Sequence, residues 1–184
     1  MTIHSRFPKD SHRQHHPKEG GAAVNMEQVR VHNWIARIDR LPTLINLAKR
    51  GIIIDSNSCP LCLAYPETGA HIFLECRLTG NVRKAINFWW KVFPERCSSM
   101  EEYFVAGRTA NHDIKNTVIK EAIFHAFTWA IWKGRNDVVF NRKPFNPLLI
   151  ANFIQTSVFS WVCNRSEIGR NRPWLYWICN PRSF

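Results

Sequence analysis

The sequence predicts a mainly α-helical protein with a small cysteine-rich knuckle ahead of a helical carboxyl-terminal region. Apolar residues recur at helical spacing along much of the chain between about residue 29 and residue 162. No segment has the pattern of a convincing sheet, and no internal repeat is visible. One short stretch concentrates residues that bind metals, namely Cys59, Cys62, His71 and Cys76.

The composition favours a folded domain that binds polyanions. Of the 184 residues, 45% are apolar, including eight Trp and twelve Phe, which is enough for a hydrophobic core. The formal net charge is +11, and for a domain this basic nucleic acid is the commonest partner. A surface charge that only keeps the protein soluble is the alternative. Residues 1–24, rich in His, Lys, Pro and Gly, predict a disordered tail.

The cysteines indicate an intracellular protein. The first 20 residues are polar and contain no apolar stretch typical of a signal peptide. In a reducing compartment, clustered cysteines bind metal, and the isolated Cys97, Cys163 and Cys179 read as ordinary thiols. Residues 144–164 carry no charge, but their Asn, Gln, Ser and Thr content is too polar for a membrane span.

The first helices are delimited by local signals. An apolar helical period runs from residue 29 to about residue 40 and stops at Pro42, since proline disfavours helix in the residue before it. Thr43 is placed to cap a second, short helix over residues 44–50. Gly51 then stands at the position after the helix end, where glycine is favoured.

The knuckle itself predicts a tight turn followed by a helix. Cys59–Cys62 forms the turn, and we expect Leu61 to be exposed at its tip. Residues 67–74 are expected to form a turn and then a helix that carries His71. On a regular helix His71 and Cys76 lie about 140° apart, so they cannot both face one metal ion. The helix must therefore end just before Cys76.

The second half of the chain predicts further helices and an irregular end. The helices are expected over residues 80–92, 98–107, 113–139 and 146–162. The helix over 113–139 has so wide an apolar face that it must be buried on more than one side. We expect the segment with Trp174 and Trp177 to be an irregular tail.

The cysteine cluster predicts a closed zinc site. Three thiolates and one imidazole complete a tetrahedral shell and leave no open position, which is typical of structural rather than catalytic zinc. Binding would also fasten a loop of about 18 residues that is otherwise weak. Two alternatives are four unrelated residues with reduced thiols and a disulfide between Cys59 and Cys62. Both are less favoured by the spacing.

Basic residues flank the cluster and predict contacts to a phosphate backbone. The candidate nucleic-acid contacts are Lys49, Arg50, Arg77, Arg83 and Lys84. Trp89 and Trp90 could stack on bases, although core packing is favoured for at least one of them. No paired carboxylates, nucleophile–base pair or glycine-rich phosphate loop is legible, so we expect this chain itself not to be an enzyme.

The motifs around the knuckle resemble the zinc-binding domain of plant LINE-type (non-LTR) retrotransposon reverse transcriptases. The residues that carry the resemblance are Leu41-Pro42-Thr43, Asn46-Leu47, Arg50-Gly51, Cys59-Pro60, Cys62, Glu67-Thr68, His71 and Cys76. The resemblance extends to about residue 184 through Trp89-Trp90, Ile131-Trp132, Arg135-Asn136, Phe159, Trp161, Trp174 and Trp177.

This resemblance implies a structural zinc module, with those four ligands, that assists RNA or DNA binding during reverse transcription. In the family the module follows an RNA-directed DNA polymerase domain, which has no counterpart here, so it implies a truncated copy without the polymerase site. The competing hypothesis is a structural or protein-interaction zinc domain. We expect RNA or DNA as the partner, with no membrane and no small-molecule substrate. The expected divisions are 1–24 (tail), 25–97 (zinc-binding domain) and 98–184 (helical extension).

Overall fold

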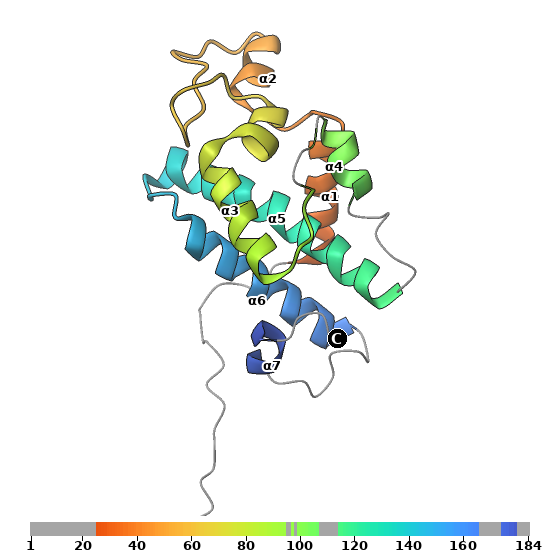
Figure 1. The fold of residues 1–184 in the computed structure, drawn as a ribbon. Coiled ribbons are helices and arrows are strands. Elements are labelled where there is room, and N and C mark those ends of the chain that lie inside the picture. Colours follow the sequence, from red (N-terminus) through yellow and green to blue (C-terminus); the bar gives the residue numbers. More distant parts are fainter. Residues whose placement is uncertain (1–24, 95–96, 98, 107–113, 166–173, 180–184) are drawn as a thin grey trace, which may run out of the picture.

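The computed structural model describes residues 25–94, 97, 99–106, 114–165 and 174–179 (Figure 1). Helices make up nearly all regular structure in these residues, and the strand signal is limited to one isolated bridge between Ser58 and Pro66. The helices are α1 (Met26–Arg37), α2 (Leu44–Lys49), the π-helix η1 (His71–Glu75), α3 (Arg77–Trp89), α4 (Met100–Ala106), α5 (Ile114–Asn141), α6 (Pro147–Arg165) and α7 (Trp174–Cys179). The mainly helical fold class is confirmed. The tail predicted over 1–24 lies outside the described residues.

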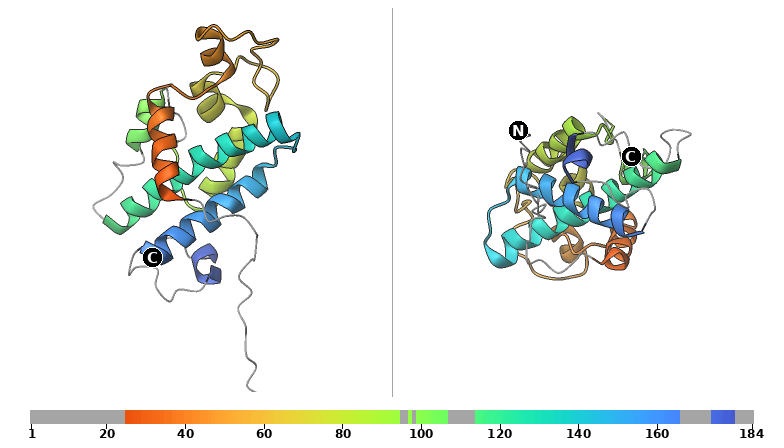
Figure 2. Two further views of the ribbon diagram at one scale, coloured as in Figure 1. Left: turned by 180° about the vertical axis from the view of Figure 1, so that it is seen from behind. Right: turned by 90° about the horizontal axis from the view of Figure 1, so that it is seen from below.

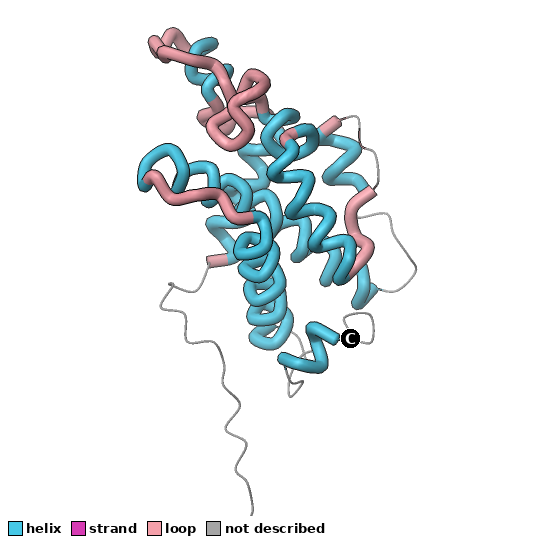
Figure 3. The backbone as a smooth tube through the Cα atoms, turned by 60° about the vertical axis from the view of Figure 1, so that its left-hand side comes forward, coloured by secondary structure: helices cyan, strands magenta, loops and turns pink. Residues whose placement is uncertain are grey.

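The body of the protein is built on the antiparallel pair α5 and α6 (Figures 1 and 2). α1 packs against α5, α3 packs against α6, and the shorter α4 and α7 pack against α1 and α6 respectively. The irregular segment with α2 and the knuckle forms a lobe at one end of this body, as the pink loops of Figure 3 show. η1 joins the lobe to the body because it contacts both α3 and α5.

The capping signals in the sequence act as predicted. The side chain of Thr43 accepts a hydrogen bond from the Asn46 amide at the start of α2. Gly51 has a φ of 81°, a left-handed conformation that costs glycine little. Asn146, for which no capping role was predicted, also caps α6 by accepting from the amides of Leu148 and Leu149.

The close packing of α5 on α6 depends on a glycine. A Cβ atom added at Gly134 would lie 2.9 Å from Cε2 of Phe145 and 3.0 Å from Cδ1 of Ile150. Only the absence of a side chain at Gly134 leaves room for the side chains of Phe145 and Ile150 against α5. As the sequence indicated, α5 is buried on more than one side: Ile119, Phe124, Phe127, Ile131 and Trp132 are all buried.

A tryptophan cluster closes the other end of the body. The rings of Trp89 and Trp90 both contact Trp177, at centroid distances of 5.3 and 6.1 Å. Trp90 and Trp177 are buried, so the core reading is correct for Trp90 and the expected irregular tail is wrong at α7. The reason is tertiary: Trp177 is buried against Phe159 of α6 as well as against α3.

None of the helices in the described part of the chain is both long enough and apolar enough to cross a membrane. This holds for α6, which includes most of the uncharged stretch at residues 144–164.

Candidate metal centre

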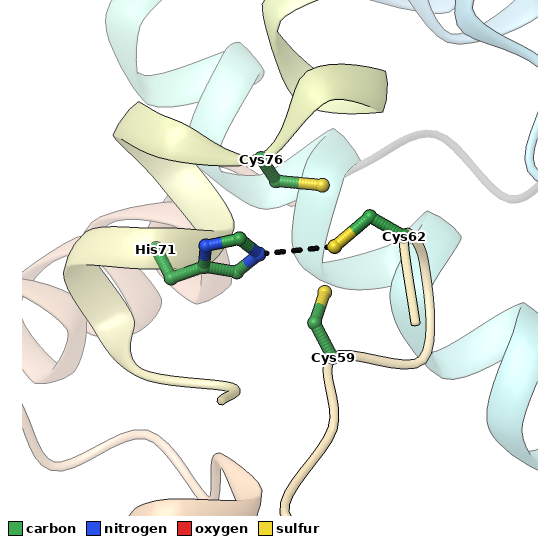
Figure 4. Close-up of side chains that lie close together, drawn as sticks. All are labelled: Cys59, Cys62, His71 and Cys76. Carbon is green, nitrogen blue, oxygen red and sulfur yellow. Dashed lines mark hydrogen bonds between the residues drawn. The ribbon is translucent and has the colours of Figure 1, made fainter. Parts of the chain in front are cut away.

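The four residues predicted as ligands lie together in the structure (Figure 4). One ligand atom from each of Cys59, Cys62, His71 and Cys76 lies within 4.8 Å of all the others. Sγ of Cys62 lies 3.3 Å from Nε2 of His71. The four side chains converge from the knuckle on one side and from η1 and its end on the other.

The knuckle is a hydrogen-bonded turn. The Cys59 amide donates to the carbonyl oxygen of Tyr65 at 2.7 Å, and the Leu63 amide donates to the carbonyl oxygen of Cys59 at 2.8 Å. The expectation that Leu61 is exposed at the tip is wrong, because Leu61 is only 8% exposed. Leu63 is the exposed residue, and its φ of 58° turns the chain so that Leu61 packs into the core.

The break predicted ahead of Cys76 is present, and its form explains how His71 and Cys76 meet. η1 is a π-helical turn in which the Cys76 amide donates to the carbonyl oxygen of His71 at 2.8 Å. An i→i+5 hydrogen bond brings residues five apart close to one another, which a regular α-helix does not do. Cys76 then leaves the helix with a ψ of 127° and stands as the N-cap of α3.

The contact with Cys59, and after it the position at the start of α3, favour the thiolate of Cys76. A hydrogen bond from Cys59 lowers the pKa of Cys76 to about 5, and the amides of Leu78 and Thr79 act in the same direction. The pKa of Cys59 is raised by the same contact and by burial. A lowered pKa favours the thiolate, which is the form of cysteine that coordinates a metal ion.

His71 is held so that its Nε2 atom faces the thiols. Its backbone amide donates to Oγ1 of Thr68 at 2.9 Å, which fixes the start of the turn. Its Nδ1 atom lies 3.7 Å from a carboxylate oxygen of Glu75, and the ring of Tyr65 covers it at a centroid distance of 5.6 Å. A carboxylate on the far nitrogen is a common way to orient a histidine ligand.

The donor set and its spacing fit zinc. A tetrahedral site with bonds of about 2.0–2.3 Å places its sulfur and nitrogen atoms about 3.5–3.8 Å apart. The Cys62–His71 distance of 3.3 Å and the upper limit of 4.8 Å for all pairs of ligand atoms in the cluster lie on either side of these values. Small side-chain movements would therefore complete the tetrahedral shell. With four protein ligands, a bound zinc ion would supply cross-linking of the turn, and no coordination position would remain for a substrate.

A buried ion pair connects the knuckle to the helical body. The carboxylate of Glu67 accepts two hydrogen bonds from the guanidinium of Arg135, each of 2.7 Å. The same carboxylate accepts from the Leu44 amide at the start of α2, at 2.8 Å. Neither side chain of the pair is more than 4% exposed. Because Glu67 stands between Cys62 and His71, the pair fixes the knuckle against α5.

The predicted nucleic-acid contacts fall into two groups. Lys49 and Arg50 lie at the end of α2, where the Arg50 guanidinium donates to the carbonyl oxygen of Arg40 at 2.7 Å. Arg77 and Lys84 are exposed on α3. Arg83 is half-buried and donates to the carbonyl oxygen of Leu74, so it braces the end of η1 instead of facing solvent.

Two side chains that matter for this site were given no role in the sequence analysis. Glu67 and Arg135 appeared there only as part of a resemblance, because 68 positions separate them and no local signal links them. One signal in the sequence could have indicated a role for Arg135, namely a charged residue close to Trp132 in an otherwise apolar helix. In the structure Cζ of Arg135 lies 5.0 Å from the centroid of the Trp132 ring.

Comparison with known families identifies the segment around the knuckle. Residues 21–83 match the family model described as zinc-binding in reverse transcriptase. Comparison with curated proteins and with solved structures gives no match. The matched segment includes α1, α2, the four clustered residues and the first half of α3. Over these residues, about a third of the chain, the knuckle is therefore similar to that of the zinc-binding domain of reverse transcriptases.

Proposed function

We propose that the chain is the carboxyl-terminal part of a LINE-type RNA-directed DNA polymerase. In this proposal a structural zinc ion holds a surface that binds RNA or DNA, and the chain contributes binding without the polymerase active site. The observation that carries the proposal is the junction at Cys76. This residue belongs to the ligand cluster and caps α3, which presents Arg77 and Lys84 to solvent.

The charge of the chain supports a polyanionic partner. The formal net charge of +11 gives a long-range attraction to phosphate, and exposed Lys49, Arg77 and Lys84 supply cations on both sides of the cluster. Zinc would act indirectly, by fixing α2 and α3 relative to each other through the knuckle.

The test is a titration of the zinc-loaded full chain with single-stranded RNA and with duplex DNA at two salt concentrations. We expect binding that weakens steeply with salt and that is lost when zinc is chelated or when Cys59→Ser removes a ligand. Cys179→Ser is the matched control, because Cys179 is an exposed thiol away from the cluster. Absence of binding at low salt by the zinc-loaded protein would refute the proposal.

A protein-interaction zinc domain is the second candidate. The observation that favours it is an exposed apolar pair on α1, where Trp34 is 62% exposed and Val31 is 53% exposed. Such a domain would bind zinc equally well but would show no salt-dependent affinity for nucleic acid, so the same titration separates the two functions.

A further inference from the structure

One face of α3 is an exposed stripe with an unusual composition. Arg77, Asn81, Lys84 and Phe88 follow one another at spacings of four, three and four residues, and all four are exposed. At 100° per residue they fall within about 60° of each other around the helix axis. We call these four residues the α3 stripe.

The α3 stripe lies directly opposite the buried side of the helix. Thr79, Val82 and Ile86 are fully buried and pack α3 onto the body, where it contacts η1 and α6. These buried residues lie about 180° from the centre of the stripe. Figure 1 shows α3 on the near side of the molecule, in front of α5 and α6. The exposure of the four stripe residues agrees with this position.

The charged residues within α3 are all basic, although the exposed carboxylate of Glu75 lies just before the helix. Residues 76–94 contain Arg77, Arg83, Lys84 and Lys91 and no acidic residue. A basic helix face attracts phosphates, and here no carboxylate on the same face can pair with the cations instead. This property distinguishes α3 from α1, where Arg37 forms an ion pair with Glu101 at 2.5 Å.

Phe88 gives the stripe a second chemistry. Its side chain is 96% exposed, the largest value among the large apolar side chains that the structure describes. A single exposed phenyl ring is ordinary on a protein surface. Phe88 differs because its ring lies in register with two cations and an amide, the combination that tracks a phosphate backbone while stacking an unpaired base.

The tryptophans next to Phe88 cannot take this role. Trp90 is 3% exposed, and both Trp89 and Trp90 pack against Trp177 in the core. Phe88, and not Trp89 or Trp90, is therefore the aromatic residue of α3 that is exposed and able to stack on a base.

We propose that the α3 stripe binds a single-stranded polynucleotide, with Phe88 stacking on an unpaired base and Arg77 and Lys84 contacting phosphates. From Arg77 to Phe88 the helix rises about 16 Å, which is the length of roughly five phosphates in a stacked strand. Bases paired in a duplex do not offer their faces to a side chain, so the stripe discriminates for single strands. This inference rests on the proposed function and assigns that function to one surface.

The first arm of the test removes the aromatic ring. Fluorescence anisotropy measures the affinity of the zinc-loaded full chain for short labelled oligouridine and oligothymidine strands and for a duplex. We expect Phe88→Ala and Phe88→Leu to weaken single-strand binding at least about fivefold, the loss of one modest base stack, and Phe88→Trp to retain it. Phe140→Ala is the matched control, because this phenyl ring is 72% exposed at the end of α5.

The second arm removes charge without touching the ring. We expect Lys84→Gln to reduce the slope of log affinity against log salt by about 0.7, the value for one phosphate contact on a single strand. Phe88→Ala should leave that slope unchanged, because stacking releases no counterions. Lys143→Gln is the control, since Lys143 is exposed just after α5 and outside the stripe.

The outcomes separate this inference from the proposed function. If the parent chain binds single strands but Phe88→Ala binds them equally well, the assignment of binding to the α3 stripe is refuted. The proposed function is not affected by that result. If duplex is bound as tightly as single strands, the assignment to an unpaired base is also overturned. If the zinc-loaded parent chain binds neither, the proposed function fails and the inference fails with it.

Discussion

Arg135→Met tests whether the buried ion pair fixes the knuckle. The change removes two of the three hydrogen bonds that the Glu67 carboxylate accepts and leaves only the Leu44 amide. Glu67 is fully buried, so its charge would then have no counter-ion and no water. Removing one partner of a buried pair costs about 3–5 kcal/mol of unfolding free energy, and we expect a loss in this range.

The double variant Glu67→Gln with Arg135→Met separates charge from packing. Glutamine keeps an acceptor for the Leu44 amide and carries no charge, so the uncompensated carboxylate disappears. We expect the double variant to recover most of the stability that Arg135→Met loses. Lys133→Met is the matched control on the same helix, because Lys133 is exposed and forms an exposed ion pair with Asp137 at 3.4 Å. It should cost less than about 1 kcal/mol.

Two assays measure the effect. Urea unfolding of the zinc-loaded chain gives the free energy of unfolding, and competition with a chromophoric chelator gives the zinc affinity. Because Glu67 lies between two clustered residues, we expect Arg135→Met to weaken zinc affinity as well as stability. A loss below 1 kcal/mol, or a double variant as unstable as Arg135→Met, would refute the reasoning that an unpaired buried charge is the cause.

Three further changes have distinct expected results. Gly134→Ala should destabilise the chain by about 1–3 kcal/mol in urea unfolding, because its methyl group would press on Phe145 and Ile150. Gly80→Ala should stabilise it by about 0.5–1 kcal/mol, since nothing lies closer than 3.9 Å to the added methyl group; a loss would contradict this. His32 has its pKa lowered from 6.5 to about 4 by burial. As the pH falls, His32 is therefore protonated in the unfolded state before it is protonated in the folded state. The free energy of unfolding is unaffected by this residue above pH 6.5 and falls by about 3 kcal/mol towards pH 4. His32→Gln should flatten this pH dependence, and an unchanged slope would rule out the assignment.

The parts of the fold that depend on neighbours in the sequence were predictable. The cap at Thr43, the turn at Gly51 and the break before Cys76 are each specified by residues within one helical turn. The four clustered residues were predictable for the same reason, since their spacing alone restricts them to one small loop.

The parts that were missed depend on distant contacts. α7 forms where Trp177 is buried against α6 and α3, and a six-residue helix has no independent stability in water. The Leu61 error has a local cause, because the left-handed backbone of the knuckle falls at Leu63, a residue type that seldom adopts it. The role of Phe88 required the helical register of α3, which the structure places from Arg77 rather than from Gly80.

The π-helical turn between His71 and Cys76 has a consequence for how such sites vary in length. A π-turn holds one more residue than an α-turn while bringing its two ends together. A related chain with three residues between the histidine and the cysteine would reach the same juxtaposition on an ordinary α-helix. The site can therefore gain or lose one residue here during evolution and keep its metal-binding geometry, so a fixed spacing is too strict a criterion for finding its relatives.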